Sequence, residues 1–290
     1  MEYQLWKCIV ALLIGLDKTP DGCDFSDTRI VQVFYWAVIH DRPVSWACQR
    51  RHWPVYQRRR PLPSNATMSR RLKTPTVLAL LATLEQRVVA PKEPEIFWMI
   101  DGKPLSIGGC SKDRHAGYGR SAGGKALGYK VHALISSRGA IAAWRVAPMN
   151  TDERVMAGRI LKAADIQGYL LADSNYDSNK LHAICDGRES LQLLVRRRYG
   201  PKHGTGHRRQ SEGRVRSMAR LENPFPAFAD RLMQDRSEIE RQFGSWSNWG
   251  GGLTGLPPWV RTHRRVHRWV QAKLVLTGLK RQNSIRTYVT

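Results

Sequence analysis

The chain has 290 residues, 42% of them hydrophobic and 24% charged, so its composition is that of a globular protein and excludes both wholesale disorder and a membrane bundle. Lys and Arg number 47 against 24 Asp and Glu, which gives a formal net charge of +23 at pH 7. Most of these bases are Arg, whose planar guanidinium binds phosphate in a bidentate manner, so the charge indicates a polyanionic partner, above all nucleic acid. A generically solubilised surface is the alternative, although such a surface would carry charges of both signs.

The N-terminal segment and the cysteines bear on the compartment. The apolar run from Leu5 to Leu16 contains Lys7 and is too short to span a bilayer. No basic segment precedes it and no small-residue cleavage site follows, so we expect a packed helix rather than a signal peptide. The five cysteines form no CxxC motif, which speaks against a disulfide framework or a zinc ribbon and fits a reducing cytosol.

The first ninety residues are predicted to be helical. Ile30, Val31, Phe34 and Val38 recur at the spacing of one helix face, which predicts a helix from Asp27 to His40. Further helices are expected at Val44–Arg51, at Ala66–Leu72 with Ser64 and Asn65 as N-cap candidates, and from Pro75 to about Val88.

Three short helices separated by breaks are typical of a helix-turn-helix, in which the helix Ala66–Leu72 would be the recognition helix. Polar and arginine side chains on such a helix contact base edges, while flanking bases hold phosphates. A solvated helical arm is the alternative. The residues predicted to contact DNA here are Arg58, Arg59, Arg60, Thr67, Ser69, Arg70 and Arg71.

The pattern changes to strands from Ile96 onward. The continuous apolar run Ile96–Ile100 predicts a strand that is buried on both faces and ends at Asp101. Two strands around the turn 137–139, Tyr129–Ser136 and Ala140–Ala147, should pair as a hairpin. The elements expected next are a helix Thr151–Ala164, a strand Tyr169–Ala172, a helix Ser178–Asp186 and a strand Leu191–Val195. Together they predict an α/β fold with a mixed sheet.

A basic segment interrupts this pattern from Arg196 to Arg220. It shows little hydrophobic periodicity, so we expect a solvent-exposed loop within an insertion of about residues 196–229. Its position between the last strands and the next helix predicts that Arg208 and Arg209 contact DNA. Two final helices are expected at about Asp230–Trp246 and Pro258–Lys280.

Two acids stand at the ends of apolar strands, Asp101 and Asp173. A three-stranded meander followed by a βα unit can bring the first and fourth strands side by side, which would place both carboxylates in one cleft. A third acid would complete a site for magnesium, which prefers oxygen ligands. Glu238 and Glu240 are both candidates, and they lie on opposite flanks of the apolar stripe of their helix, so periodicity does not choose between them.

From Ile96 to about Trp246 the sequence resembles the DDE transposases of bacterial insertion sequences. The matching stretches are Ile100–Leu105, Gly128–Leu134, Leu171–Ser178, and Arg236 with Ile239–Phe243, and they occur in the order of the family. In that family the last acid lies four residues after an arginine, which selects Glu240. The family's tyrosine before that arginine is Met233 here, and its lysine after the acid is Ser247.

The resemblance implies a ribonuclease-H-like catalytic domain in which Asp101, Asp173 and Glu240 hold two Mg²⁺ or Mn²⁺ ions. Two such ions activate a water or a 3′-hydroxyl and stabilise the leaving oxygen of a phosphodiester displacement. Lys130, Arg236 and Arg241 are phosphate-contact candidates, although Arg236 and Glu240 also form an ordinary i,i+4 pair. His132 is a candidate for touching the site or a buried structural histidine, and Asp177 is expected to cap the following helix.

The organisation expected from these features has three parts. Residues 1–92 form an all-helical DNA-binding region, residues 93–250 the catalytic domain, and residues 251–290 a basic C-terminal helix. The implied function is transposition by a cytoplasmic, nucleoid-associated bacterial protein. The expected partner is double-stranded DNA, namely the terminal inverted repeats and the target DNA. The protein is expected to form a homodimer when it assembles on DNA and to have no membrane partner. The alternatives are a catalytically silent, domesticated DNA-binding regulator and a nuclease that cuts without strand transfer.

Overall fold

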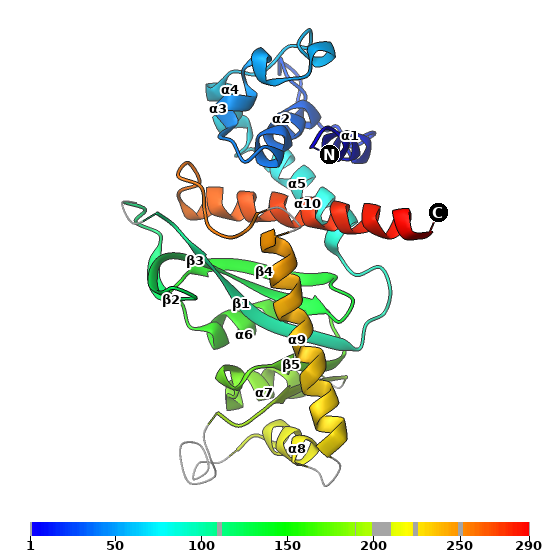
Figure 1. Ribbon diagram of the computed structural model, residues 1–290, viewed down its shortest axis with the longest axis vertical. Coiled ribbons are helices and arrows are strands. Elements are labelled where there is room, and N and C mark those ends of the chain that lie inside the picture. Colours follow the sequence, from blue (N-terminus) through cyan, green and yellow to red (C-terminus); the bar gives the residue numbers. More distant parts are fainter. Residues whose placement is uncertain are drawn as a thin grey trace. The chain divides into compact units, whose positions relative to one another are not determined.

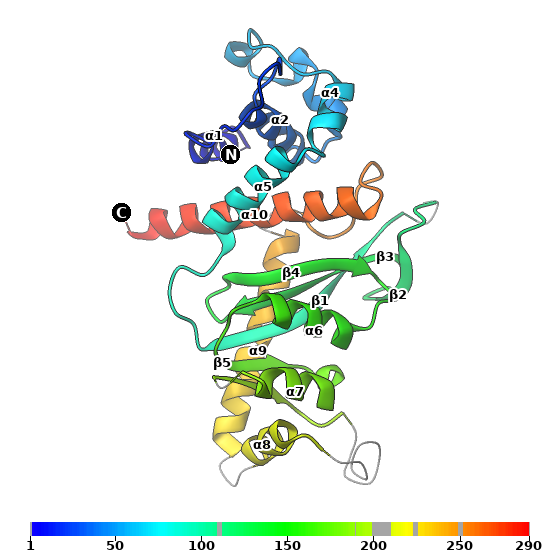
Figure 2. The ribbon, with the colours of Figure 1, turned by 180° about the vertical axis from the view of Figure 1, so that it is seen from behind.

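The computed structural model describes residues 2–108, 112–188, 190–198, 210–222, 226–248 and 252–289. Its contacts divide the chain into two compact units, Met1–Val89 with Trp246–Thr290, and Ala90–Ser245. Figures 1 and 2 show the elements from two opposite sides.

The secondary-structure elements of the first unit, within the described residues, are all helices. Its elements are α1 (Glu2–Leu12), α2 (Asp27–Ile39), α3 (Val44–Ala47), η1 (Arg50–His52), η2 (Val55–Gln57), α4 (Asn65–Arg71), α5 (Pro75–Val89) and α10 (His263–Val289). The helices predicted from Asp27, Ser64 and Pro75 are confirmed, whereas the helix predicted from Val44 is shorter and continues as a 3₁₀ turn. Ser26 and Ser64 act as N-caps, accepting hydrogen bonds from the backbone N–H groups of Arg29 and Thr67.

An aromatic cluster and the C-terminal helix hold this unit together. Trp36 and Trp53 stack at 4.9 Å, and Trp6 meets both rings edge-on. Helix α10 packs on α5, and Gln271 Nε2 donates to Glu85 Oε2 at 2.6 Å. The end of the chain is therefore part of the same core as the N-terminal helices.

The second unit is a mixed α/β structure. Its described strands form a six-stranded sheet from β1 (Phe97–Ser106), β2 (Gly117–Ser121), β3 (Gly124–Ser136), β4 (Ile141–Pro148), β5 (Gly168–Ala172) and β6 (Leu191–Val195). The order is β2-β3-β1-β5-β6, and β4 also pairs with β3. The pairs β1–β5 and β5–β6 are parallel and the others antiparallel. The predicted meander and the adjacency of its first strand to β5 are confirmed.

Helices cover both faces of this sheet. Its helical elements are α6 (Glu153–Ala163), η3 (Ser174–Tyr176), α7 (Asn179–Asp186), α8 (Glu212–Leu221) and α9 (Pro226–Asn248), the last of which ends in the first unit. Helix α9 crosses one face in Figure 1, and α6 and α7 lie on the opposite face in Figure 2. This is the α/β arrangement, ribonuclease-H-like, that the sequence predicts.

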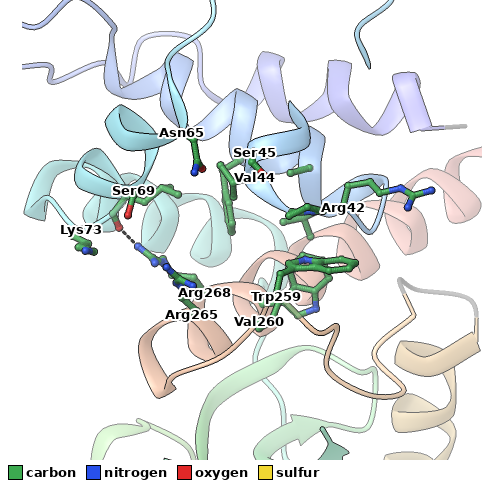
Figure 3. A pocket seen from close by; sticks show the side chains of 16 residues that line it. Arg42, Val44, Ser45, Asn65, Ser69, Lys73, Trp259, Val260, Arg265 and Arg268 are labelled. Atoms are coloured by element: carbon green, nitrogen blue, oxygen red, sulfur yellow. Dashed lines mark hydrogen bonds between the residues drawn. The ribbon is translucent and has the colours of Figure 1, made fainter. Parts of the chain in front are cut away.

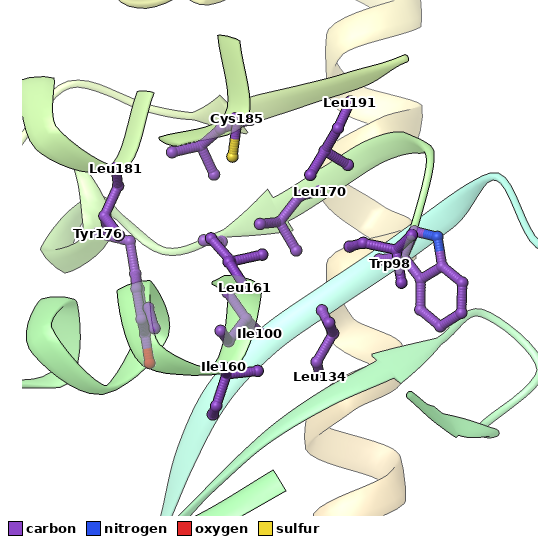
Figure 4. Close-up of a cluster of buried hydrophobic side chains, with 14 of the residues drawn as sticks. Trp98, Ile100, Leu134, Ile160, Leu161, Leu170, Tyr176, Leu181, Cys185 and Leu191 are labelled. Atoms are coloured by element: carbon purple, nitrogen blue, oxygen red, sulfur yellow. The ribbon is translucent and has the colours of Figure 1, made fainter. Parts of the chain in front are cut away.

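The core of the second unit lies between the sheet and helices α6 and α7 (Figure 4). It is built from Trp98, Ile100, Leu134, Leu170, Ile160, Leu161, Leu181 and Cys185, all at most 3% exposed. The alternation of side chains along β1 sends Trp98 and Ile100 to this core. Met99 and Asp101 therefore lie on the other face, which α9 covers.

The strands extend further than the apolar runs predicted. Strand β1 does not end at Asp101 but continues to Ser106, and β3 begins at Gly124, where it forms a hairpin with β2. Glycine is depleted in strands, so the Gly-rich segment gave no strand signal. The packing nevertheless requires these glycines, because a Cβ on Gly119 would lie 2.6 Å from Met149 and one on Gly128 2.2 Å from the carbonyl oxygen of Leu105.

The prediction of a loop over Arg196–Arg220 is wrong for residues 212–220, which belong to α8. Ser211 caps this helix. The buried face of α8 is formed mainly by Gly213, Arg214 and Ser217, with Met218 as its apolar member. Since three of these four buried residues are not apolar, the buried face leaves no apolar stripe in the sequence that would predict the helix.

Candidate active site

Asp101 and Asp173 are brought together by the parallel pairing of β1 and β5. Met99 of β1 aligns with Leu171 of β5. Asp101 lies two residues after Met99, and Asp173 lies two residues after Leu171, so the same register places the acids side by side and on one face. The predicted adjacency of these two carboxylates therefore follows from the strand order and register.

The electrostatic surroundings of Asp101 are unusual for a carboxylate. Burial raises the pKa of Asp101 to about 6, and the negative charges of Asp173 and Glu153 act in the same direction. The backbone N–H of Gly102, which donates to Asp101 Oδ1 at 2.7 Å, and the guanidinium of Arg236 oppose this increase. Such a concentration of acids on a sheet is typical of a functional site.

Asp173 occupies the turn that follows β5. Its Oδ1 accepts a hydrogen bond from the backbone N–H of Asn175 at 2.9 Å, and its Oδ2 accepts one from Asn175 Nδ2 at 3.2 Å. These bonds make Asp173 the N-cap of η3 and fix the direction of its carboxylate.

Helix α9 carries the two candidates for the third acid. Glu240 Oε1 lies 3.4 Å from Arg236 Nη2, and the Glu240 side chain is 62% exposed. Glu238 is only 20% exposed, and it pairs with Arg241 at 2.7 Å and accepts a hydrogen bond from Gln242 Nε2 at 2.7 Å. The Arg236 charge acts on Asp101, so the Arg236–Glu240 pair connects α9 electrostatically to this strand acid.

The acids do not form a complete metal cage as they stand. Among the residues that the structure describes, no group of three His, Cys, Asp or Glu side chains is placed so that it could hold a metal ion. The selection of Glu240 over Glu238 stays a prediction.

The comparison with protein families is decisive. Residues 93–273, more than half of the chain, match the model of the transposase DDE domain. The chain belongs to the transposase DDE domain family. A comparison with curated protein sequences finds no match.

Two residues beside the acids of this DDE transposase domain were not singled out from the sequence. Glu153 begins α6, where an acid is expected simply from the helix dipole, yet its charge raises the pKa of Asp101. Tyr176 is 1% exposed. Burial raises the pKa of Tyr176 well above its ordinary value, as do the charges of Asp101, Glu153 and Asp173. The Tyr176 hydroxyl has no hydrogen-bond partner in the described part of the chain.

Lys130 and His132 lie on β3, next to β1. Lys130 Nζ pairs with Glu153 Oε1 at 2.5 Å, so the ammonium group that is predicted to contact phosphate has an acid beside the site as its partner. His132 pairs across the strands with Gly102 and is 1% exposed. Burial, together with the charge of Lys130, lowers the pKa of His132 to about 4, which makes it a neutral, buried residue at neutral pH.

The predicted DNA-contacting residues of α4 and its preceding loop divide into two classes. Arg58, Arg59, Arg60, Ser69 and Arg70 are exposed, and Thr67 is half-buried. Arg71 is the exception, because its guanidinium already has partners within the protein, and its DNA contact stays a prediction. Its guanidinium is buried, where Nη2 donates to Asp27 Oδ1 at 2.7 Å and Nη1 to the carbonyl oxygen of Phe25 at 2.9 Å.

The remaining predicted contacts fall on α9 and on the basic segment. Arg241 is 71% exposed and Arg236 28% exposed. Arg208 and Arg209 lie outside the described residues, so their DNA contacts stay a prediction. No helix within the described ranges is both long enough and apolar enough to cross a membrane.

Asp177, predicted to cap α7, has a different role. Ser178 occupies the cap position instead. Asp177 accepts hydrogen bonds from Arg214 Nε and Nη2, both at 2.7 Å, and the two side chains are each 4% exposed. Burial alone would raise the pKa of Asp177, but the hydrogen bonds from Arg214 and from the Arg198 N–H outweigh it and lower that pKa, and His182 Nε2 lies 3.8 Å from Asp177 Oδ1. The pair fixes α8 to the turn that begins at Asp173.

Proposed function

We propose that this chain is a transposase that binds the inverted-repeat ends of its own mobile element, cuts the DNA there and joins the released 3′ ends to target DNA. The observation that carries the proposal is the alignment of Asp101 with Asp173 on one face of the sheet, within a transposase DDE domain. The net charge of +23 supports a DNA partner. On this proposal the protein acts at the nucleoid, in the bacterial cytoplasm, as a homodimer assembled on DNA.

The residues present fit a divalent cation. Carboxylate oxygens are the ligands that Mg²⁺ and Mn²⁺ prefer. The pKa of Asp101 is raised first by burial and then by the charges of Asp173 and Glu153, and a bound cation would neutralise these charges. Asp101, Asp173 and Glu240 would hold the ions, two in number. When bound, they would supply charge stabilisation and an activated hydroxyl for an in-line displacement at phosphorus.

The other residues of the site have roles that the protein alone determines. The Gly102 N–H orients Asp101, and Asn175 orients Asp173. Arg236 is placed to bind a DNA phosphate once Glu240 turns from it toward the strand acids, because a phosphate then replaces the carboxylate as the partner of the guanidinium. Exposed arginines on α4 and before it would position the DNA through its backbone.

A DNA-binding regulator without catalysis is the second candidate. It is favoured by one observation, namely that the three acids are not gathered into a cage among the described residues. Both candidates bind the same DNA, and they differ in whether the bound DNA is cleaved and joined.

The experiment is a reaction of the full-length protein with DNA that carries the inverted repeats flanking the gene, in the presence of Mg²⁺ or Mn²⁺. The proposal predicts cleavage at the repeat ends followed by joined products with target DNA. Specific binding without any cleavage would support the regulator, and cleavage without joined products would support a nuclease.

A further inference from the structure

A cavity of about 280 Å³ lies within the first unit, between α2, the start of α3, α4 and α10 (Figure 3). Much of its lining is apolar, with Phe34 and Val38 from α2 and the indole rings of Trp259 and Trp269 from the C-terminal part of the chain. The two indoles meet edge to face, with centroids 6.5 Å apart. Even an apolar cavity of about 150 Å³ accommodates benzene, so this one has room for a larger planar ring system.

The two indoles that line the cavity carry unsatisfied donors. Trp259 Nε1 and Trp269 Nε1 are buried without a hydrogen-bond partner among the described residues, and Trp269 is 4% exposed. The other tryptophans of this unit behave differently, since Trp36 and Trp53 donate to backbone carbonyl oxygens at 3.0 and 2.7 Å. Buried donors are normally satisfied, so two side chains that line the cavity carry N–H groups for which the described residues supply no acceptor.

The rim of the cavity is cationic. Lys73, which follows α4, and Arg265, in the first turn of α10, both line it, and none of its described lining residues is an acid. Burial lowers the pKa of Arg268, and so do the charges of Arg265 and Arg264. Cations at a helix N-terminus are repelled by the positive end of the helix dipole. An anion bound there would be stabilised by the dipole and by the cations. Figure 3 shows Arg265 and Arg268 on the side of the cavity where Ser69 and Lys73 lie, with Trp259 on the opposite side.

We propose that this cavity binds a nucleotide. The base lies among the apolar side chains, where its ring nitrogens or carbonyl oxygens accept hydrogen bonds from Trp259 and Trp269, and its phosphate meets Arg265 and Lys73. A fatty acid would match the apolar lining and the cations, but its alkyl chain has no acceptor for the buried indole N–H groups. A base with a phosphate satisfies all three features of the cavity.

The nucleotide has two sources, a free mononucleotide or an unpaired nucleotide of bound DNA. Asn65, Ser69 and Lys73, in or next to α4, line the cavity, and α4 is the candidate recognition helix, so DNA held by α4 would lie beside the cavity. Binding of a nucleotide from DNA rests on the proposed function, because it requires that the protein bind DNA. Binding of a free mononucleotide does not depend on the proposed function.

The test uses the full-length protein without metal and two sets of probes. Deoxyadenosine monophosphate and deoxyadenosine are compared by calorimetry, and we expect the monophosphate to bind at least about tenfold more tightly because only it reaches the cations. Duplexes with one unpaired adenine, with an unpaired abasic site or with full pairing are compared by fluorescence anisotropy. If DNA supplies the nucleotide, the unpaired adenine should increase affinity about tenfold over the abasic site.

Three variants assign the effect to the cavity. Trp269→Phe removes the indole donor, and Arg265→Gln removes a rim charge at an exposed position, where a substitution should leave folding unaffected. Trp269→Phe should abolish the preference for the unpaired adenine over the abasic site, and Arg265→Gln should abolish the preference for the monophosphate over the nucleoside. Arg264→Gln is the matched control, because it removes the same charge from the same helix turn but does not line the cavity.

The outcomes distinguish a free nucleotide from a nucleotide of DNA, and they distinguish a failure of this proposal from a failure of the proposed function. Binding of the monophosphate alone identifies a free nucleotide, and preference for the unpaired adenine alone identifies DNA. Absence of both, or equal effects of Arg265→Gln and Arg264→Gln, overturns the proposal. These probes contain neither terminal-repeat DNA nor metal, so their failure leaves the proposed cleavage standing, and a failure of cleavage leaves the mononucleotide result standing.

Discussion

At the scale of single residues, Asp101 is held in a position that disfavours its own ionisation. Its pKa in the fold is raised to about 6 from an ordinary value of 3.8, first by burial and then by Asp173 and Glu153. The folded protein therefore binds more protons than the unfolded chain between about pH 4 and pH 6. Stability contributed by the neutral form is present below the unfolded pKa and is lost as the pH rises through the folded value.

The substitution Asp101→Asn should therefore stabilise the metal-free protein above about pH 6, by up to about 2–3 kcal/mol. The amide keeps an acceptor for the Gly102 N–H and removes the buried charge. Thermal unfolding at about pH 5 and about pH 8 checks the sign, because the gain should be larger at the higher pH. Asp165→Asn, at an exposed acid, is the control. An unfolding temperature that does not change in Asp101→Asn would show that Asp101 ionises without cost.

At the scale of elements, α4 presents two adjacent arginines with different surroundings. Successive residues of a helix point about 100° apart. Arg70 is exposed, whereas Arg71 is 6% exposed and paired with Asp27 of α2. The sequence shows two equivalent bases, and only the packing of α2 against α4 separates them.

These arginines should respond in opposite ways to substitution. Arg70→Ala should weaken DNA binding and leave the free energy of unfolding within about 0.5 kcal/mol of the original. Arg71→Ala should destabilise the protein by about 3–5 kcal/mol, because it leaves the Asp27 charge buried without its partner. Urea unfolding and DNA titration of both variants check this. The opposite pattern would mean that Arg71, not Arg70, faces the DNA.

Helix α8 depends on one buried ion pair. Arg214→Met should cost about 3–5 kcal/mol, because Asp177 would stay buried and lose its main partner. The matched change Arg216→Met removes a 57% exposed partner of Asp186 and should cost at most about 1 kcal/mol. Since the pKa of Asp177 is lowered in the fold, the contribution of the pair should persist above about pH 4 and fade only below it. Equal unfolding midpoints of the two variants would show that the Asp177–Arg214 pair does not stabilise the protein more than an exposed pair does.

At the scale of the whole molecule, acids and bases are distributed unequally. Several acids are engaged with internal cations, as in the pairs Asp27–Arg71, Asp177–Arg214 and Glu153–Lys130. Exposed arginines such as Arg59 and Arg70 consequently carry much of the positive surplus. This distribution explains how a folded chain tolerates a charge of +23 and keeps it available for a polyanion.

The sequence predicts well whatever depends on apolar runs and chain order. The strand around Ile100, the strand before Asp173 and their adjacency follow from hydrophobicity and topology. The burial of Arg71 does not follow from the sequence, because its partner Asp27 lies far away along the chain. Glu153 was overlooked because an acid in the first turn of a helix needs no further explanation.

Elements with unusual packing were not predictable. The β2–β3 hairpin depends on glycines that fit close backbone contacts, and α8 buries Arg214 and Ser217 where an apolar stripe is expected. Local propensity predicts neither the β2–β3 hairpin nor α8, because each of them depends on a specific tertiary partner.

The central claim is that Asp101, Asp173 and Glu240 carry metal-dependent cleavage, and the rate of cleavage of terminal-repeat DNA in Mg²⁺ tests it most directly. Asp101→Asn, Asp173→Asn and Glu240→Gln should each reduce the rate by at least about a hundredfold, since residues that only orient metal ligands cost up to that much. Each should still bind the DNA. Glu238→Gln is the matched control and should cleave at close to the original rate. Undiminished cleavage by Asp101→Asn or Asp173→Asn, or loss of cleavage in Glu238→Gln with full activity in Glu240→Gln, would contradict the claim.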